Sequence, residues 1–227
     1  MEMFLSPDVD RILRAALAED IGSGDVTSCA TVAPERNIAG RYIAKENGVL
    51  CGLGIVARVF ALLDASIAFE ALARDGDAVK RGDVVAAVSG NARAILAGER
   101  VGLNLLQHMS GVATQTARAV AAVAGTGAKI VDTRKTTPGL RLLDKYAVRV
   151  GGGGNHRFNL ADGVLIKDNH IVAAGGIAAA VEAARRNAPH SLRVEVEVET
   201  LEQLELRTPM FADISRELTF ENPEGLM

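Results

Sequence analysis

The first stretch of the chain has the hydrophobic period of a helix. Ser6 can cap such a helix, and Pro7 suits its first position because the N–H that proline lacks has no partner there. The apolar side chains of one face are Ile12, Leu13, Ala16 and Leu17. This pattern predicts a helix over residues 7–19. The Gly- and Asp-containing segment that follows, EDIGSGDVTS, is typical of a structural loop.

Short β-type segments then alternate with turns over residues 39–52 and 65–96. The turns carry Asp-Gly and Arg-Gly-Asp, and a helix is predicted between the two stretches at residues 54–63. The sequence DGDAVKRGDVVAAVSG is similar to the hairpins of biotinyl and lipoyl carrier domains. No lysine stands at its tip in the usual carrier context, so we do not predict a carrier. The first hundred residues read as an α+β layer.

A second helical pattern covers residues 97–124, where the segment SGVAT either kinks one helix or joins two. After it the chain changes to short apolar runs at the ranges 128–135, 146–156, 163–170 and 192–199. A helix-like stretch at 174–187 separates the last two. This rhythm predicts parallel β/α units, in which ligands bind at the carboxyl ends of the strands.

The composition of the chain narrows the classes of function. Its 227 residues are 48% hydrophobic and carry a net charge of -3, which argues against binding nucleic acid or an anionic membrane over the whole surface. The chain has no tryptophan and no apolar run of the roughly 18 residues that a membrane span needs. The acidic start lacks the features of a signal peptide, and only Cys29 and Cys51 are present. We therefore expect a cytoplasmic protein.

Positive charge is nevertheless concentrated between residues 134 and 167. Three of these cations lie on a predicted helix and its exit and are interpreted as a solvated face: Arg141, Lys145 and Arg149. Four others stand at or just beyond predicted strand ends: Arg134, Lys135, Arg157 and Lys167. Guanidinium forks and lysine ammonium groups bind carboxylates and phosphates. The second group therefore predicts a site for a multiply anionic small ligand.

Two further segments surround this cationic set. In GGGGNHR, at residues 151–157, the glycines permit close approach of a ligand or of another backbone segment, and His156 stands beside Arg157. The spacing matches neither the Walker nor the dinucleotide-binding motif. In VEVEVET, Glu195, Glu197 and Glu199 share one strand face. That face suits either a half-exposed edge strand or a divalent-cation site, and the spacing does not separate the two.

Several of these segments together resemble one enzyme family. They are EDIGSGDVTS, GERVGLNLLQHMSGVAT, TRKTTPGLRLLDKYAVRVGGGGNHRFNL, GVLIKDNHI and VEVEVETLEQLE. Over roughly residues 10–205 they are similar to the quinolinate phosphoribosyltransferases. The resemblance implies an α/β protein: an N-terminal α/β sandwich domain over residues 1–105, then an incomplete, truncated α/β barrel over residues 106–227 that carries the active-site strand ends. It also implies a homodimer with shared active sites.

The implied reaction joins quinolinate to 5-phosphoribosyl-1-diphosphate with Mg²⁺, and gives nicotinate mononucleotide, CO₂ and diphosphate for NAD biosynthesis. The residues that would hold the quinolinate carboxylates are Arg134, His156, Arg157 and Lys167. Lys135 would be catalytic and lie between the two substrates. Glu197 would be catalytic and face the ribose and the metal. Arg100 would bind substrate in the neighbouring subunit's site.

After LEQLE the resemblance ends, and the family's later strands and phosphate loop have no visible counterpart. About 120 residues follow the long helical pattern. At roughly 30 residues per β/α unit, this makes too few units to close a barrel. We therefore expect the phosphoribosyl half of the site to be incomplete. The alternatives are a truncated quinolinate-binding relative, the molybdenum-locus paralogue of the same fold, or a non-enzyme that forms mixed dimers and donates Arg100.

Overall fold

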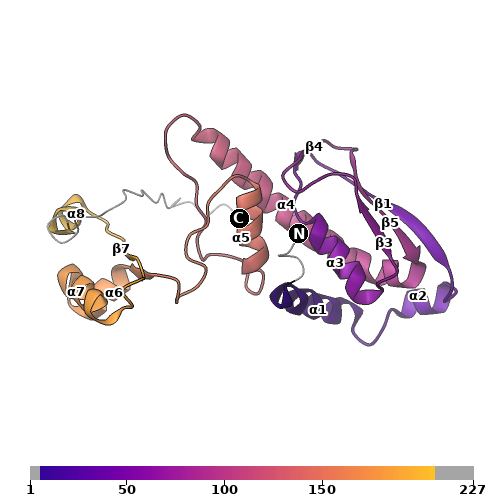
Figure 1. Ribbon diagram of the computed structural model, residues 1–227, viewed down its shortest axis with the longest axis horizontal. Coiled ribbons are helices and arrows are strands. Elements are labelled where there is room, and N and C mark those ends of the chain that lie inside the picture. Colours follow the sequence, from indigo (N-terminus) through magenta and orange to yellow (C-terminus); the bar gives the residue numbers. More distant parts are fainter. Residues whose placement is uncertain (1–5, 208–227) are drawn as a thin grey trace. The chain divides into compact units, whose positions relative to one another are not determined.

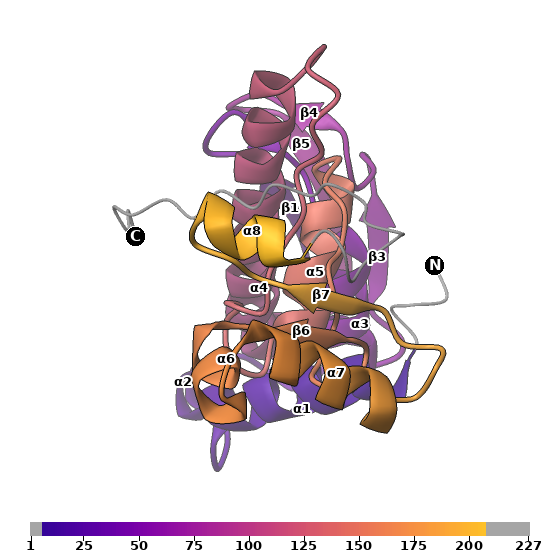
Figure 2. The same ribbon diagram turned by 90° about the vertical axis from the view of Figure 1, so that its left-hand side faces the viewer.

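The computed structural model describes residues 6–207 (Figure 1, Figure 2). The chain divides into two compact units, and the boundary in the sequence falls between Phe158 and Asn159. The two family-like halves predicted from the sequence would meet earlier, at residue 105, and that boundary stays a prediction. Within residues 6–207, every helix is too short or too polar to cross a membrane.

The first unit begins with α1 (Pro7–Ile21), which confirms the predicted helix and its cap. The Ser6 hydroxyl accepts a hydrogen bond from the Val9 N–H at 3.3 Å, and the buried face packs into the core. The following segment is only partly a loop, because α2 (Val26–Thr31) begins inside it. The Asp25 carboxylate caps α2 by accepting the Ser28 N–H at 2.9 Å.

Two small antiparallel sheets form the centre of this unit. One has the order β1-β5-β3, with β1 (Asn37–Ile43), β3 (Ala68–Ala71) and β5 (Val84–Asn91). The other pairs β2 (Gly48–Val49) with β4 (Ala78–Val79). The predicted turns lie between these strands, and Gly76 and Gly82 have φ of 98° and 100°, a conformation that side chains disfavour.

Helices α3 (Leu53–Leu63) and α4 (Ala92–Ala122) pack against the three-stranded sheet (Figure 1). The buried residues of this layer include Phe60 of α3, Val88 of β5 and Leu106 of α4. The predicted helix at 54–63 is therefore confirmed, and so is the sandwich of helices on a sheet.

The SGVAT segment does not divide the chain into two helices, because α4 continues through it. Ser110 and Thr114 lie one turn apart on α4 and bind β2 and the residues just after it. The Ser110 hydroxyl accepts the Cys51 N–H at 3.0 Å, and the Thr114 hydroxyl accepts the Val49 N–H at 2.9 Å. Polar side chains that a helix would otherwise expose thus attach it to the sheet.

Helix α5 (Arg141–Val150) follows a loop and packs on α4. The predicted apolar strand at 146–156 is therefore wrong for its first half, which is the end of this helix. Leu143 and Ala147 of α5 are fully buried in the core shared with α1 and α4. Tyr146 donates its hydroxyl to Asp75 at 2.9 Å, and burial followed by the nearby Asp75 carboxylate raises the pKa of Tyr146. The phenol thus stays protonated and attaches α5 to the turn before β4.

The second unit is a parallel β/α arrangement. Strands β6 (Val164–Ile166) and β7 (Val194–Val196) pair in parallel, and α6 (Asp168–Ala174), α7 (Ile177–Asn187) and α8 (Leu201–Arg207) accompany them (Figure 2). Val181 of α7 is fully buried beside Ile166 and Val196. The helix predicted at 174–187 is confirmed as α7, which begins three residues later because Gly175 and Gly176 adopt φ of 84° and 134°. The strand predicted over 194–200 ends earlier, at Val196.

Candidate active site

Two loops that carry predicted anion-binding residues lie side by side in the first unit. Val131 and Gly154 form a parallel β-bridge, in which the Asp132 N–H donates to the Gly154 carbonyl at 3.1 Å and the Gly154 N–H donates to the Ile130 carbonyl at 2.8 Å. The bridge is all that forms of the strand predicted at 128–135. It is enough to bring the TRKTTPG and GGGGNHR segments together.

A buried ion pair lies directly beneath these loops. Lys145 Nζ of α5 is 2.5 Å from Asp132 Oδ1, and the two side chains are 5% and 6% exposed. The same Asp132 oxygen accepts the His156 N–H at 2.8 Å, while Lys145 Nζ donates to the His156 carbonyl at 3.1 Å. The Asn155 amide donates to Asp132 Oδ2 at 2.6 Å and to the Lys145 carbonyl at 2.8 Å. The ion pair therefore joins α5 to both loops.

A second buried carboxylate of α5 holds the TRKTTPG loop from its other end. Asp144 is 6% exposed, and its Oδ2 accepts the Thr137 N–H at 2.9 Å. Its Oδ1 is hydrogen bonded to His108 Nε2 of α4 at 2.5 Å. His108 is thus a structural histidine with a partner, and Asp144 ties the loop to two helices.

Arg141 completes this set of contacts from the first turn of α5. Its guanidinium donates to the Thr136 hydroxyl at 3.0 Å, to the Phe158 carbonyl at 3.2 Å and to the Arg134 carbonyl at 3.4 Å. The interpretation of Arg141 and Lys145 as a solvated helix face is therefore wrong. Only Arg149 of that group is exposed, where it lies over the Tyr146 ring.

The four glycines of the second loop serve its packing on the protein's own helices. A Cβ at Gly151 would lie 2.4 Å from the Ala113 carbonyl oxygen of α4, and one at Gly153 would lie 2.8 Å from Thr116 Cγ2. Gly152 has a φ of 89°. The sequence left open whether these glycines allow a ligand or another backbone segment to approach closely. In the first unit, the backbone of α4 approaches closely at Gly151.

The predicted ligand residues of these loops remain accessible on the outside. Arg134, His156 and Arg157 are partly buried, and Lys135 is exposed. Arg134 Nε is buried and has no hydrogen-bond partner among the described residues. A buried guanidinium donor without an acceptor is costly, and an anionic ligand would supply the acceptor. The loops thus carry cationic side chains with one unsatisfied buried donor, Arg134 Nε, and are held from below by Asp132 and Asp144.

In the second unit, two predicted site residues pair with each other. Lys167 follows β6 and Glu197 follows β7, so both stand at carboxyl ends of parallel strands. Lys167 Nζ is 2.6 Å from Glu197 Oε2, and the side chains are 39% and 44% exposed. The Lys167 N–H donates to His170 Nδ1 at 3.0 Å, which fixes the turn into α6. Glu195 lies within β7, whereas Glu199 lies beyond the end of that strand at Val196.

The described residues contain no group of three or more His, Cys, Asp or Glu side chains able to hold a metal ion. Glu197 offers one exposed carboxylate at a strand end. Mg²⁺ is commonly bound by one or two carboxylates together with substrate phosphates and water. The donor set therefore fits a metal that arrives with a phosphorylated substrate and does not form a dedicated protein cage in this part of the chain.

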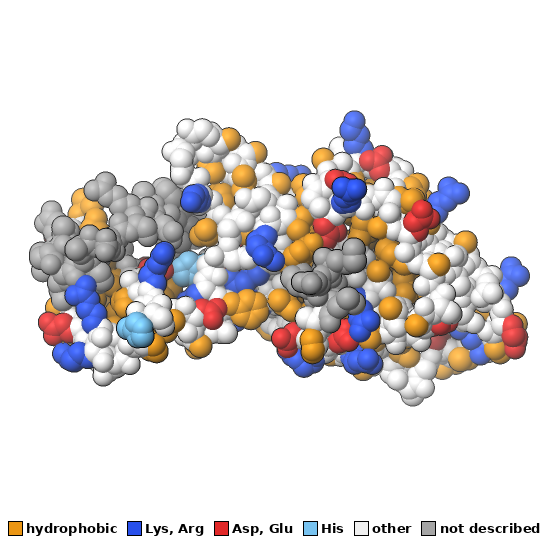
Figure 3. Space-filling model, viewed as in Figure 1, with side chains coloured by type: hydrophobic (Ala, Val, Ile, Leu, Met, Phe, Trp, Pro, Cys, Tyr) orange, Lys and Arg blue, Asp and Glu red, His pale blue; other side chains and the backbone are white. Residues whose placement is uncertain are grey.

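Arg100, the residue predicted to reach another subunit, is exposed on α4. On the face shown in Figure 3, Lys and Arg side chains of the first unit are interspersed with Asp and Glu. Such mixing agrees with the expectation that anion binding is local to particular loops.

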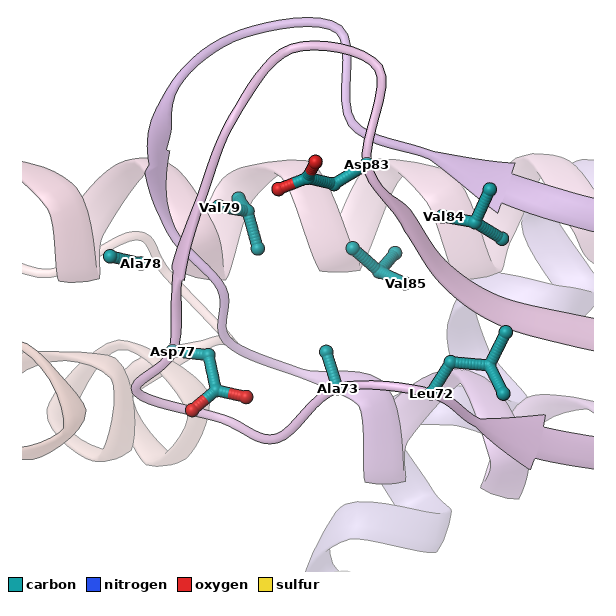
Figure 4. Close-up of a pocket in the computed structure, with 8 residues that line it drawn as sticks. All are labelled: Leu72, Ala73, Asp77, Ala78, Val79, Asp83, Val84 and Val85. Atoms are coloured by element: carbon teal, nitrogen blue, oxygen red, sulfur yellow. The ribbon is translucent and has the colours of Figure 1, made fainter.

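A depression of about 400 Å³ lies elsewhere in the first unit, between the hairpins around β4 and β5 (Figure 4). Its lining residues are Leu72, Ala73, Asp77, Ala78, Val79, Asp83, Val84 and Val85. Asp77 and Asp83 each accept a turn N–H at 2.8 Å, from Arg74 and Lys80. The carboxylates in this hollow therefore stabilise turns, and its lining includes none of the predicted site residues.

Known proteins share both halves of this structure. Residues 25–110 match the quinolinate phosphoribosyl transferase N-terminal domain model, and residues 112–216 match the C-terminal domain model of the same family. A probable nicotinate-nucleotide pyrophosphorylase [carboxylating] of Synechocystis is 50% identical over 197 residues, covering 87% of this chain and 66% of the relative. The corresponding Bacillus subtilis protein is 46% identical over 212 residues, covering 93% and 72%.

A solved structure gives the same result for the fold. The crystal structure of NadC from Streptococcus pyogenes matches with a TM-score of 0.84 and 47% identity, covering 88% of this chain and 71% of that chain. The predicted fold class, an N-terminal α/β sandwich followed by an incomplete α/β barrel, is thereby confirmed. The chain spans about two thirds of the length of these relatives.

Proposed function

Because the chain belongs to the quinolinate phosphoribosyltransferase family, we propose that it transfers the phosphoribosyl group of 5-phosphoribosyl-1-diphosphate to quinolinate in NAD biosynthesis. The products are nicotinate mononucleotide, CO₂ and diphosphate. The observation that carries the proposal is the pair of bridged loops, with Arg134 Nε buried and without a partner among residues 6–207. Quinolinate has two carboxylates, and these would satisfy such donors.

The proposal assigns each cation a role. Arg134, His156 and Arg157 hold quinolinate carboxylates from the bridged loops. Lys167 is also assigned to a quinolinate carboxylate, for which it would exchange its present partner Glu197. Lys135, exposed beside Arg134, supplies positive charge between the two anionic substrates. Each charge-assisted hydrogen bond contributes about 1.5 to 3 kcal/mol, so several together would bind a dianion tightly.

The chemistry follows from holding the pyridine nitrogen against the anomeric carbon of the donor. The nitrogen lone pair forms the new bond to that carbon, and the bond to diphosphate breaks with its electron pair on the leaving oxygen. The positively charged ring then accepts the electron pair left by the departing CO₂, and the ring carbon takes up a proton. The carboxylate of Glu197 would stabilise positive charge that develops on the ribosyl group.

Mg²⁺ is the proposed cofactor, with Glu197 as the described residue that would contact it. When bound with the donor it would neutralise negative charge on the diphosphate. The lone exposed carboxylate at the end of β7 supports this mode of binding.

We also propose a homodimer in which Arg100 of one copy completes the site of the other. Its exposure on α4 leaves the guanidinium available for such a contact. A cytoplasmic location is part of the same proposal, supported by two free cysteines and the absence of a spanning helix within residues 6–207.

Calorimetry with quinolinate, followed by an assay of diphosphate release with both substrates, tests the proposal. Arg134→Met should weaken quinolinate binding by about tenfold to a hundredfold, which corresponds to the loss of one charge-assisted bond. Arg118→Met, which removes an exposed arginine from α4, is the matched control. Binding without turnover would favour a quinolinate-binding protein over an enzyme. Absence of binding by the unaltered chain would refute both.

A further inference from the structure

Three charged side chains of α5 point toward the two anion-binding loops and are bonded there: Arg141, Asp144 and Lys145. We propose that one of them, Lys145, acts together with Asp132 as a pair of positioning residues for His156. The two residues do not contact the ligand. Their function is to fix the main chain from which the His156 ring projects.

The hydrogen bonds from the ion pair to the second loop are directed at the main chain of one residue, His156. The Asp132 carboxylate accepts the N–H of His156 at 2.8 Å, and the Lys145 ammonium donates to its carbonyl at 3.1 Å. Both main-chain polar groups of His156 are thus bound by the two members of a single ion pair. Movement of the His156 backbone would break a charge-assisted hydrogen bond on one side or the other.

The burial of the pair favours positioning over simple stabilisation. Taking an ammonium and a carboxylate out of water is expensive, and a well-packed apolar pair of similar volume is often as stable. An apolar pair, however, could neither accept the His156 N–H nor donate to its carbonyl. A buried ion pair at this place is therefore explained by the geometry that it imposes on the loop.

The same pair also orients the neighbouring residue. The Asn155 amide bridges Asp132 Oδ2 and the Lys145 carbonyl, so the residue before His156 is held as well. Binding groups must be held within about 0.5 Å of their productive positions to act together. Loosening this frame would misplace the His156 ring, and with it the neighbouring Arg157, relative to a bound ligand.

This inference rests on the proposed function, because quinolinate is the ligand that His156 would contact. The test is the double variant Asp132→Asn/Lys145→Met, which removes both charges and leaves neither one buried alone. The matched control is Asp10→Asn/Arg58→Met, which removes a partly exposed ion pair between α1 and α3, far from His156 in the sequence. Both are examined by calorimetry with quinolinate and by ¹H–¹³C spectra of the histidine rings, with His156 assigned through His156→Gln.

We expect the double variant to bind quinolinate at least about tenfold more weakly, since small misplacements of binding groups have effects of this size or larger. The His156 signal should shift or broaden, while that of His190, which lies in the second unit, stays in place. The control should change neither. A purely structural pair would lower the unfolding temperature of the double variant and leave the quinolinate affinity and the His156 signal unchanged, which would overturn the proposal.

Two further outcomes separate this inference from the proposed function. If the unaltered chain does not bind quinolinate, the proposed function fails. The His156 signal alone then decides whether Asp132 and Lys145 position His156. If the double variant does not fold, Asp132→Glu alone keeps both charges of the pair and displaces the carboxylate by one methylene group. A smaller shift of the His156 signal is then expected, and an unmoved signal would again overturn the proposal.

Discussion

Two lysine–carboxylate pairs of the molecule have almost the same length and opposite surroundings. Lys145 and Asp132 are 2.5 Å apart and about 5% exposed, whereas Lys167 and Glu197 are 2.6 Å apart and about 40% exposed. Distance alone would rank them as equal. Solvent makes the difference, because a buried charge depends on its partner, while an exposed charge can take water, salt or a ligand in its place.

The contrast assigns the two pairs different tasks. The buried pair cannot release either member without leaving an uncompensated charge, so it suits a permanent frame. The exposed pair can open at little cost, so it suits a residue that must exchange one anion for another. A binding site for a dianion needs both properties: a frame that does not move and cations that can change partners.

Breaking the buried pair should have the largest effect on stability. Lys145→Met should lower the free energy of unfolding by about 3 to 5 kcal/mol, because Asp132 keeps a buried charge. Lys167→Met, the same substitution in the exposed pair, should cost at most about 1 kcal/mol. Urea unfolding followed by circular dichroism measures both. Equal losses in the two variants would contradict the role given to burial.

Substitution by alanine should likewise distinguish a closely packed glycine from one with open space around it. Gly151→Ala should destabilise the protein by about 1 to 3 kcal/mol, because its Cβ would meet the Ala113 carbonyl and overpack the contact with α4. Gly111→Ala lies in the same α4 helix with open space around it and should stabilise by about 0.5 to 1 kcal/mol. Opposite signs in thermal unfolding are expected. A stabilised Gly151→Ala would show that the loop does not pack against α4 in this way.

Freeing Lys167 should have a smaller effect, in the direction of tighter binding. Glu197→Gln removes the competing carboxylate, so quinolinate should bind up to about fivefold more tightly at low salt, equivalent to at most about 1 kcal/mol. The gain should shrink in 1 M NaCl, where the Debye length is about 3 Å. Glu182→Gln, from an exposed pair within α7, is the control for the change in net charge. Weaker binding by Glu197→Gln in calorimetry would mean that Glu197 assists the ligand instead of competing with it.

The pair of Asp10 and Arg58 is intermediate in exposure, and its contribution to stability should depend on pH. Asp10 and Arg58 form two bonds of 2.7 and 2.6 Å, and about a quarter of each side chain is exposed. The hydrogen bonds from Arg58 lower the pKa of Asp10 below its ordinary value. The folded state therefore gains stability above the unfolded value of about 3.9 and loses it as pH falls through the lower folded pKa. The free energy of unfolding of Asp10→Asn should fall less steeply with decreasing pH than that of the unaltered chain. Identical curves would mean that this pair does not contribute to the pH dependence of stability.

The sequence was sufficient for those features that depend on local pattern. Period and capping predicted α1 and α3, and the positions of strand ends predicted that the segments around Arg134 and His156 would lie near each other. Whether these residues bind quinolinate stays a prediction, as do the roles of Lys135, Arg100 and Glu197. The resemblance to a family supplied those roles, and the described geometry supplies unused donors at Arg134.

The role of α5 could not be predicted, because periodicity assigns residues to a face without telling what covers it. Arg141, Asp144 and Lys145 share a charged face, and most charged helix faces meet water. The charged face of α5 is instead covered by Asp132, Thr137 and the main chain of His156, all of which lie in the two loops. The available signal was the pair of acids, Asp132 and Asp144, within a strongly cationic stretch, since each could neutralise a buried cation.

The glycine contacts also constrain how the chain can diverge. Any amino-acid substitution of a glycine introduces a residue with a Cβ, and at Gly151 that atom has no room beside Ala113. Relief would require a displacement of α4, whose Thr114 is bonded to Val49 of β2 and whose Ser110 is bonded to Cys51 just after that strand. The loop, the helix and the strand edge therefore accept substitutions only as a group. Divergent copies of this chain should accumulate changes at Arg118 or Arg149 long before they alter this short run of glycines.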